Sequence, residues 1–336
     1  MKPTMNKLLI KFSFSLFLVF LFTAISFAKN TGPVKMGMVT GGAKGTYYQF
    51  GLNLAELVES KGIMLNVANS NGSVENVFAV YKRPNTQMGI VQSDVLAFVA
   101  KVQTDPVLKN IAKKIKMIYP LYNEEVHLLG SSNIADFDQL EGKRVAIGQE
   151  GSGTYLTAKL LFEVSGVNPS ELLTIGADEA LPQLKAGEVD ALFYVAGSPV
   201  KLFSEQVTSA DGLALIPILN KSIVEFYPKT EIPPNTYAWQ TKAIQSVAVK
   251  AVLVSYDFKM ANCQNVGRFA DILANNIDWL KENGHPKWHS VDLEYPLKGW
   301  EQYECVTNFQ GKSKKTTKPN KSKDINPILE AIKKIL

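Results

Sequence analysis

Short apolar runs alternate with amphipathic stretches along most of the chain, and this alternation predicts strands followed by helices. Residues Val34–Val39 form one apolar run; a glycine-rich loop follows, and the apolar spacing from Thr46 onward predicts a helix. The same order recurs later, where residues 144–147 predict a strand and residues 154–164 predict a helix. Strands that alternate with helices indicate a parallel-rich α/β architecture.

The tripeptide Gly-Thr-Tyr occurs at the strand-to-helix turn of both units, at residues 45–47 and 153–155. Glycine at such a turn lets a ligand approach the backbone, and the start of a helix leaves unpaired N–H groups that favour an anion. The two copies therefore predict two similar lobes that hold a carboxylate or a phosphate between them. Taken singly, either copy is equally well explained as an ordinary helix start with a glycine-rich turn.

Two further strand-like runs of the first lobe also end in polar turns. Residues 64–68 lead into the polar residues 69–73, and residues 88–91 lead into residues 92–94. In an open parallel sheet, ligands bind beyond the carboxyl ends of the strands, where such turns lie. Capping of the following helix is the alternative role for these small polar residues, and for Ser73 in particular.

The first 28 residues have the pattern of a secretory signal peptide. They contain three lysines and no acid, then an apolar run over residues 12–22, and then Ser26 and Ala28 at the two positions that determine cleavage. The apolar run is shorter than the roughly 20 residues of a membrane-spanning helix. We predict cleavage after Ala28 and a soluble, extracytoplasmic protein; an uncleaved anchor is the alternative. The 336 residues suit two lobes.

The net charge of +5 is distributed unevenly along the chain. The three lysines of the signal contribute +3, and residues 311–336 contribute +6 from eight lysines and two acids, so residues 29–310 carry 5 − 3 − 6 = −4. A mildly acidic body removes the composition argument for nucleic-acid binding, and we predict no nucleic-acid partner. Residues 311–323 have the composition of a flexible linker, and residues 325–336 predict an amphipathic helix that docks on the protein, touches a membrane or frays.

Two cysteines, Cys263 and Cys305, remain after the signal peptide. An even number in an exported chain predicts a disulfide, with two buried thiols as the alternative. The three histidines, His127, His285 and His289, form no paired ligand motif with the cysteines, so the sequence predicts no metal site.

Two fragments imitate short-chain dehydrogenases. Residues 40–45 resemble their cofactor loop, and Tyr155 and Lys159 have the spacing that places a phenol and an ammonium on one helix face. However, Tyr47 stands where the last glycine of that loop belongs, and residues 69–70 supply no acid for an NAD ribose. Serine-hydrolase and P-loop patterns fail as well. We therefore predict that the protein is not an enzyme and uses no cofactor.

The glycine-rich and polar turns occur in a fixed order, at residues 41–48, 71–76, 89–94, 148–154 and 190–197. As an ordered set they resemble the TAXI family, the extracytoplasmic solute-binding proteins of TRAP transporters. The resemblance covers residues 31–310, and the lysine-rich tail departs from the family pattern.

The resemblance implies an α/β protein with the two-lobed periplasmic-binding-protein type II fold. Each lobe is then a mixed, mostly parallel sheet flanked by helices, with the ligand cleft at the hinge. The resemblance also implies a monomeric periplasmic receptor, a Na⁺-driven TRAP-type membrane permease as partner, and an organic acid or an acidic amino acid such as glutamate as ligand. A periplasmic sensor that signals to a membrane receptor uses the same closing cleft and is the alternative.

The predicted organisation follows from this fold. A strand-like run at residues 116–119, the polar residues 123–125 and a second apolar run at residues 126–130 suggest a crossing between lobes. The expected segments are residues 1–28 (signal peptide), 29–126 (first part of lobe 1), 127–245 (lobe 2), 246–310 (return to lobe 1 and C-terminal helices) and 311–336 (linker and amphipathic helix).

The ligand-binding residues carried over from the family lie in the five turns. They are Gly42, Gly45, Thr46, Tyr47, Asn71, Ser73, Gln92, Ser93, Asp94, Gly151, Ser152, Gly153, Thr154, Tyr194 and Gly197.

These residues suit a ligand that carries a carboxylate. Backbone N–H groups near Gly45 and Gly153, with the hydroxyls of Thr46, Ser152 and Thr154, suit carboxylate oxygens. Ser152 and Thr154 are the sharpest candidates.

Three side chains have further predicted roles, each with an alternative. Asp94 suits an amino group or a helix cap, Tyr47 a wall of the site or the core, and Tyr194 a wall or the lobe interface. Glu124 and Glu125 rank below these residues, because a charge at a hinge is usually solvated.

Overall fold

The computed structural model describes residues 32–310, apart from residues 102–104, 259–260 and 301. The predicted signal peptide, the predicted linker and the predicted terminal amphipathic helix lie outside the described residues. The chain divides into two compact units, Met1–Gly32 and Pro33–Leu336, and everything below concerns the second unit.

Ten strands of the described chain are joined by hydrogen bonds in the order β2-β1-β3-β10-β4-β7-β5-β6, with β8 paired to β4 and β9 paired to β10. The strands are β1 (Val34–Val39), β2 (Ile63–Ala68), β3 (Met88–Gln92), β4 (Ile115–Ser131), β5 (Arg144–Ala146), β6 (Glu171–Leu173), β7 (Ala191–Ala196), β8 (Leu213–Leu215), β9 (Lys229–Ile232) and β10 (Ile244–Tyr256).

Helices α1 to α8 lie in the connections between these strands, and α9 to α11 follow the last strand. They are α1 (Thr46–Glu59), α2 (Ser73–Lys82), α3 (Ser93–Lys101), α4 (Pro106–Lys114), α5 (Gly153–Ser165), α6 (Ala177–Lys185), α7 (Lys201–Gln206), α8 (Lys221–Phe226), α9 (Ala261–Asn275), α10 (Ile277–Asn283) and α11 (Glu304–Gln310), with 3-10 turns η1 (Phe137–Leu140), η2 (Ser209–Asp211) and η3 (Pro286–Ser290).

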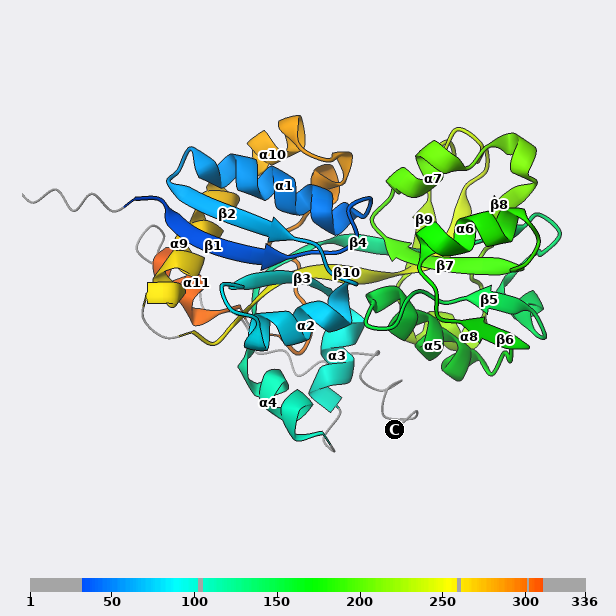
Figure 1. The fold of residues 1–336 in the computed structure, drawn as a ribbon, viewed down its shortest axis with the longest axis horizontal. Helices are drawn as coiled ribbons and strands as arrows, with labels where there is room; N and C mark the ends of the chain where they lie inside the picture. Colours follow the sequence, from blue (N-terminus) through cyan, green and yellow to red (C-terminus); the bar gives the residue numbers. More distant parts are fainter. Residues whose placement is uncertain (1–31, 102–104, 259–260, 301, 311–336) are drawn as a thin grey trace, which may run out of the picture. The chain divides into compact units, whose positions relative to one another are not determined.

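Two lobes are built around opposite ends of the long strands β4 and β10 (Figure 1). We call lobe 1 the part formed by β1 to β3, α1 to α4 and α9 to α11, and lobe 2 the part formed by β5 to β7 and α5 to α8. The β4 strand is antiparallel to β10 over lobe 1 and then antiparallel to β7 over lobe 2. The crossing predicted near residues 123–125 is therefore an uninterrupted strand rather than a loop between two strands.

The sheet of lobe 1 is covered on both faces, which explains its continuous apolar runs. Successive residues of a strand point to opposite faces. In β10, Ala251 and Leu253 belong to the core beneath α1 and α9, whereas Val252 and Val254 belong to the core beneath α2 to α4. The same division occurs in lobe 2, where Phe193 packs in the core with α5 and α8 and Leu192 packs in the core with α6 and α7.

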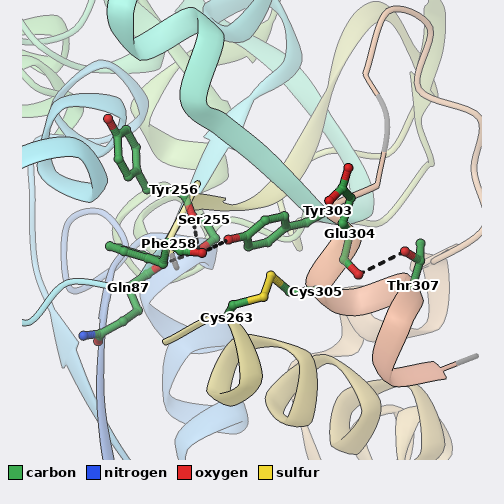
Figure 2. The surroundings of a disulfide bond; sticks show 9 residues. All are labelled: Gln87, Ser255, Tyr256, Phe258, Cys263, Tyr303, Glu304, Cys305 and Thr307. Atoms are coloured by element: carbon green, nitrogen blue, oxygen red, sulfur yellow. Dashed lines mark hydrogen bonds between the residues drawn. A yellow bond between two sulfur atoms is a disulfide. The ribbon is translucent and has the colours of Figure 1, made fainter. Parts of the chain in front are cut away.

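The predicted disulfide joins Cys263, near the start of α9, to Cys305, near the start of α11, with 5.3 Å between the two Cα atoms (Figure 2). The Tyr303 hydroxyl, drawn beside this bond, donates a hydrogen bond to the Phe258 carbonyl at 2.9 Å. The disulfide therefore fixes α11 against α9. No helix in the described part of the chain has the length and apolar character needed to cross a membrane.

Removal of this disulfide is expected to lower the free energy of unfolding by about 4 kcal/mol, because the chain-entropy model gives roughly that value for a loop of this size. The two cysteines are 42 positions apart in the chain. Urea denaturation of the Cys263→Ser/Cys305→Ser double variant, compared with the oxidised wild-type protein, measures the loss. An unchanged unfolding midpoint would show that the bond does not stabilise the fold.

Candidate ligand-binding site

A cavity of about 340 Å³ lies between the two lobes. Lobe 1 contributes the loop before α1, the start of α2 and the end of β3, and lobe 2 contributes the loop before α5, the start of α6 and strand β7. Its floor includes Glu124 of the crossing strand β4. Residues from both Gly-Thr-Tyr copies thus face one cavity, as the sequence predicts.

Four helices begin at the wall of this cavity. The N-cap residues Gly45 of α1, Gly72 of α2 and Gly176 of α6 make no side-chain cap hydrogen bond, and all three line the cavity. The fourth N-cap is Ser152 of α5, whose Oγ accepts a hydrogen bond from the Tyr155 N–H at 3.0 Å. Because the first N–H groups of a helix lack partners within the helix, the cavity wall is rich in donors for an anion.

The Glu124 carboxyl lies on the floor of the cavity and is buried, with an exposed fraction of 1%. Its Oε1 accepts a hydrogen bond from the Tyr47 hydroxyl at 2.5 Å, and its Oε2 accepts one from Gln92 Nε2 at 3.3 Å. Burial raises the pKa of Glu124 to about 8, and the hydrogen bonds from Tyr47 and Gln92 oppose this rise. The expectation of a solvated hinge charge is therefore wrong for Glu124.

The neighbouring Glu125 is also buried, but it has a cationic partner. Its Oε1 pairs with Lys287 Nζ at 2.5 Å, and its Oε2 accepts a hydrogen bond from the Ser198 N–H at 2.9 Å. The buried His127 belongs to the same cluster, because its Nδ1 lies 3.0 Å from the Glu125 carbonyl oxygen and its Nε2 lies 2.9 Å from the Tyr237 hydroxyl. Burial lowers the pKa of His127 to about 4. This cluster ties β4 to η3 and to the segment after β7, and its members do not line the cavity.

The two lobes contact each other around the cavity, so the structure is in a closed arrangement. The Thr46 hydroxyl donates to the Gly197 carbonyl at 2.8 Å, and the Glu75 N–H donates to the Gly151 carbonyl at 3.0 Å. At Gly153 the contact is so close that a Cβ would lie 1.9 Å from Gln92 Oε1. Glycine at this position is what allows α5 to approach lobe 1.

Further contacts close the edge of the cavity. Gln149 Nε2 donates to Asn71 Oδ1 at 3.1 Å, and Lys44 Nζ lies 2.9 Å from Asp178 Oδ1. The Lys44–Asp178 pair is largely exposed, so it contributes little to stability.

The structure brings most of the predicted binding residues to one place. The cavity is lined by Gly42, Gly45, Thr46, Tyr47, Asn71, Ser73, Gln92, Ser152, Gly153, Thr154 and Tyr194. Their contact with a ligand stays a prediction. Two of the hydroxyls already have structural partners: Ser152 caps α5, and Thr154 Oγ1 accepts a hydrogen bond from the Val195 N–H at 3.1 Å.

Four predicted residues, Ser93, Asp94, Gly151 and Gly197, are not among the cavity walls. The Gly151 and Gly197 carbonyls are acceptors in the lobe contacts, and Ser93 Oγ accepts from the Lys250 N–H at 3.0 Å.

Asp94 has the clearest alternative partners. Its Oδ2 accepts hydrogen bonds from the Thr157 hydroxyl at 2.7 Å and from the Tyr227 hydroxyl at 3.4 Å, both in lobe 2, and its Oδ1 accepts one from the Val95 N–H at 2.9 Å. Burial raises the pKa of Asp94 to about 6. In this closed arrangement Asp94 joins the lobes and is not among the cavity walls, and its contact with a ligand amine stays a prediction.

Several cavity residues escaped the sequence analysis. Glu124 was only a lower-ranked candidate; Gly41, Gly72, Gly148, Gln149, Phe193, Val195 and Ala196 lie in the predicted turns but were not singled out; and Gly176, Ala177, Asp178 and Glu179 were not predicted at all. Glu124 had a usable signal, because Asn123, Glu124 and Glu125 form a polar group within a mostly apolar strand of 17 residues. The described residues contain no group of three or more His, Cys, Asp or Glu side chains arranged to hold a metal ion.

Comparison with known proteins agrees with this architecture. Residues 38–261 match the model of the NMT1-like family. A solved structure from Bordetella bronchiseptica RB50 is similar with a TM-score of 0.51 and 16% identity, over 90% of this chain and 89% of that one. The periplasmic binding protein BugD is similar with a TM-score of 0.51 and 11% identity, over 84% of this chain and 97% of that one. The predicted periplasmic-binding-protein fold is thus confirmed.

The buried Glu124 carboxyl makes stability depend on pH. In the folded protein its pKa is about 8, whereas its ordinary value is 4.5. The stability that it contributes is therefore complete below pH 4.5 and is lost as the pH rises through 8. Between about pH 6.5 and 7.5 the free energy of unfolding should fall by up to about 1.4 kcal/mol per pH unit through this group.

Urea denaturation of the wild-type protein and of Glu124→Gln at several pH values in this window measures that dependence. The variant has no titrating group at this position, so its stability should change less with pH by the amount stated. Glu163→Gln, on the exposed side of α5, is the matched control and should keep the wild-type slope. Equal slopes in the wild-type protein and Glu124→Gln would contradict the prediction.

Proposed function

The chain belongs to the NMT1-like family, and we propose that it is the extracytoplasmic solute-binding receptor of a TRAP-type transporter of the TAXI class. In this role it captures a small carboxylate-bearing solute between its lobes and delivers it to a membrane permease. It acts in the periplasm as a monomer, after a signal peptide has been removed behind Ala28.

The observation that carries the proposal is the convergence of four helix N-termini on one interlobe cavity, three of them without a side-chain cap. Each helix N-terminus is equivalent to roughly half a positive elementary charge. Uncapped N–H groups together with these dipoles bind a carboxylate without an arginine or a lysine. The same walls include apolar and aromatic side chains, which suits a small organic solute.

Closure about β4 and β10 supplies the mechanism. The two strands are the continuous connection between the lobes, and their pairing is irregular between Lys250 and Val252 and between Leu253 and Val254. A solute in the cavity contacts both lobes only when they are closed, so its binding shifts the population toward the closed form. The permease then distinguishes the loaded receptor by its closed shape, and no covalent bond is made or broken.

The direct test is isothermal titration calorimetry of the purified protein with a panel of amino acids, monocarboxylates and dicarboxylates. We expect one solute class to bind with a stoichiometry of one, and small-angle X-ray scattering to show a smaller radius of gyration after binding. A correctly folded protein that binds no member of the panel would contradict the proposal.

A single lobe contact offers a sharper measure of closure. Thr46→Val keeps the shape of a buried side chain but removes its hydrogen bond to the Gly197 carbonyl. One such bond contributes about 1 kcal/mol, so affinity for the bound solute should fall about fivefold. Thr307→Val, which removes an exposed hydroxyl on α11, is the control and should keep the wild-type affinity. An equal loss of affinity in both variants would show that the loss in Thr46→Val does not come from the missing contact between the lobes.

A further inference from the structure

The cavity walls carry an excess of acidic side chains. Three carboxyl groups line the cavity, those of Glu124, Asp178 and Glu179, and no lysine, arginine or histidine is among its lining residues. Asp178 is paired with Lys44 at the exposed rim, and Glu179 is exposed. Glu124, by contrast, is buried on the floor and forms no ion pair with any residue that the structure describes.

The surroundings of Glu124 leave it able to accept more hydrogen bonds. A carboxylate has about four lone-pair positions. Tyr47 and Gln92 each donate one hydrogen bond to this group, one to each oxygen. Two positions therefore remain for donors, and the cavity is the space that a ligand donor occupies. Its neighbour Glu125 shows the contrast, because Lys287 and the Ser198 N–H already satisfy that carboxylate from within the protein.

The aromatic rings of the cavity favour the same kind of ligand group. The Tyr47 and Tyr194 side chains line the walls, whereas the Phe193 ring packs on Phe162 in the core of lobe 2. The negative face of an aromatic ring attracts a cation, and this attraction strengthens where water is excluded. Glu124 and the two tyrosine rings therefore suit a positively charged nitrogen of a ligand.

The helix N-termini that line the same cavity supply donors for the negative end of a ligand. Their N–H groups accommodate one carboxylate, as the proposed function requires. A second carboxylate of the same solute has no side-chain cation to receive it among the cavity walls and is repelled by the ionised form of Glu124. The cavity is thus matched to a ligand that has one negative and one positive end.

We infer that the solute is a zwitterion with a single carboxylate and a positively charged nitrogen, in the class of neutral and basic amino acids, and that Glu124 selects it over dicarboxylates. This inference rests on the proposed function and narrows its ligand class. It changes the expectation drawn from the family resemblance, because glutamate becomes a poorer ligand than glutamine.

The electrostatics of Glu124 support the selection. Burial without a nearby cation raises the pKa of this carboxyl to about 8. A ligand ammonium beside it supplies the missing counter-ion and favours the ionised carboxylate. The neutral Gln at the same position would keep its shape but lose this attraction.

Calorimetry with matched pairs tests the inference on the wild-type protein. The first pair is L-glutamine and L-glutamate, which differ by the second carboxylate; the second is 5-aminopentanoate and glutarate, in which an aminomethyl group replaces a carboxylate. The third is L-leucine and its 2-hydroxy analogue, which lacks the ammonium. In each pair that binds, we expect the first-named compound to bind at least tenfold more tightly than the second.

The variant Glu124→Gln assigns the selectivity to its residue. Its affinity for the best amino acid should fall at least tenfold, and its preference over the matched dicarboxylate or hydroxy acid should shrink by the same factor. Glu163→Gln removes one negative charge from the surface outside the cavity and should keep both values.

The outcomes separate this inference from the proposed function. Tight binding of glutarate, glutamate or a hydroxy acid in preference to its zwitterionic partner overturns the inference and leaves the solute-binding receptor standing. An unchanged amino-acid affinity in Glu124→Gln also overturns it. Absence of binding by every compound to the folded wild-type protein overturns both. Should the variant fail to fold, the matched pairs on the wild-type protein still decide.

Discussion

The antiparallel pairing of β4 with β10 is the constraint on which the rest of the structure depends. These two strands are long enough to serve both lobes, and each lobe builds its own parallel strands outward from them. A sheet that is covered by helices on both faces must be apolar along almost its whole length. The pairing therefore restricts the positions along these strands at which a charged residue is tolerated. It also places the floor of the cavity at the point where the chain passes from one lobe to the other.

Two adjacent glutamates on β4 show how neighbouring positions acquire different chemistry. Because side chains alternate across a strand, Glu124 and Glu125 lie on opposite sides of it. Glu125 meets Lys287 in a buried ion pair, so its charge is compensated within the protein. Glu124 meets only the neutral donors of Tyr47 and Gln92 within the described chain, so no cation there compensates its ionised form. Residue type alone does not distinguish the two; the elements packed against each face do.

The fold and much of the cavity could be predicted because their signals are local. Apolar periodicity located β1 and α1, and glycines at the strand-to-helix turns located the walls around Gly45 and Gly153. Asp94 and Glu124 were harder for opposite reasons. Asp94 follows a strand like the cavity residues do, but Thr157 and Tyr227 from the other lobe cover it, and no local pattern records that contact. Glu124 resembled a solvated hinge charge, and only the packing of the two lobes shows that it is buried.

The lobe contacts outside the cavity have a consequence for how substitutions change the affinity for a solute. The hydrogen bonds from Thr157 and Tyr227 to Asp94 join the lobes without requiring a solute. If the chain is the receptor proposed above, they bias its equilibrium between open and closed forms before any solute binds. Apparent affinity is the intrinsic affinity multiplied by the populated fraction of the binding-competent state. These contacts therefore raise or lower the apparent affinity without touching the solute. Substitutions at such positions adjust the solute concentration to which the receptor responds while leaving its choice of solute intact.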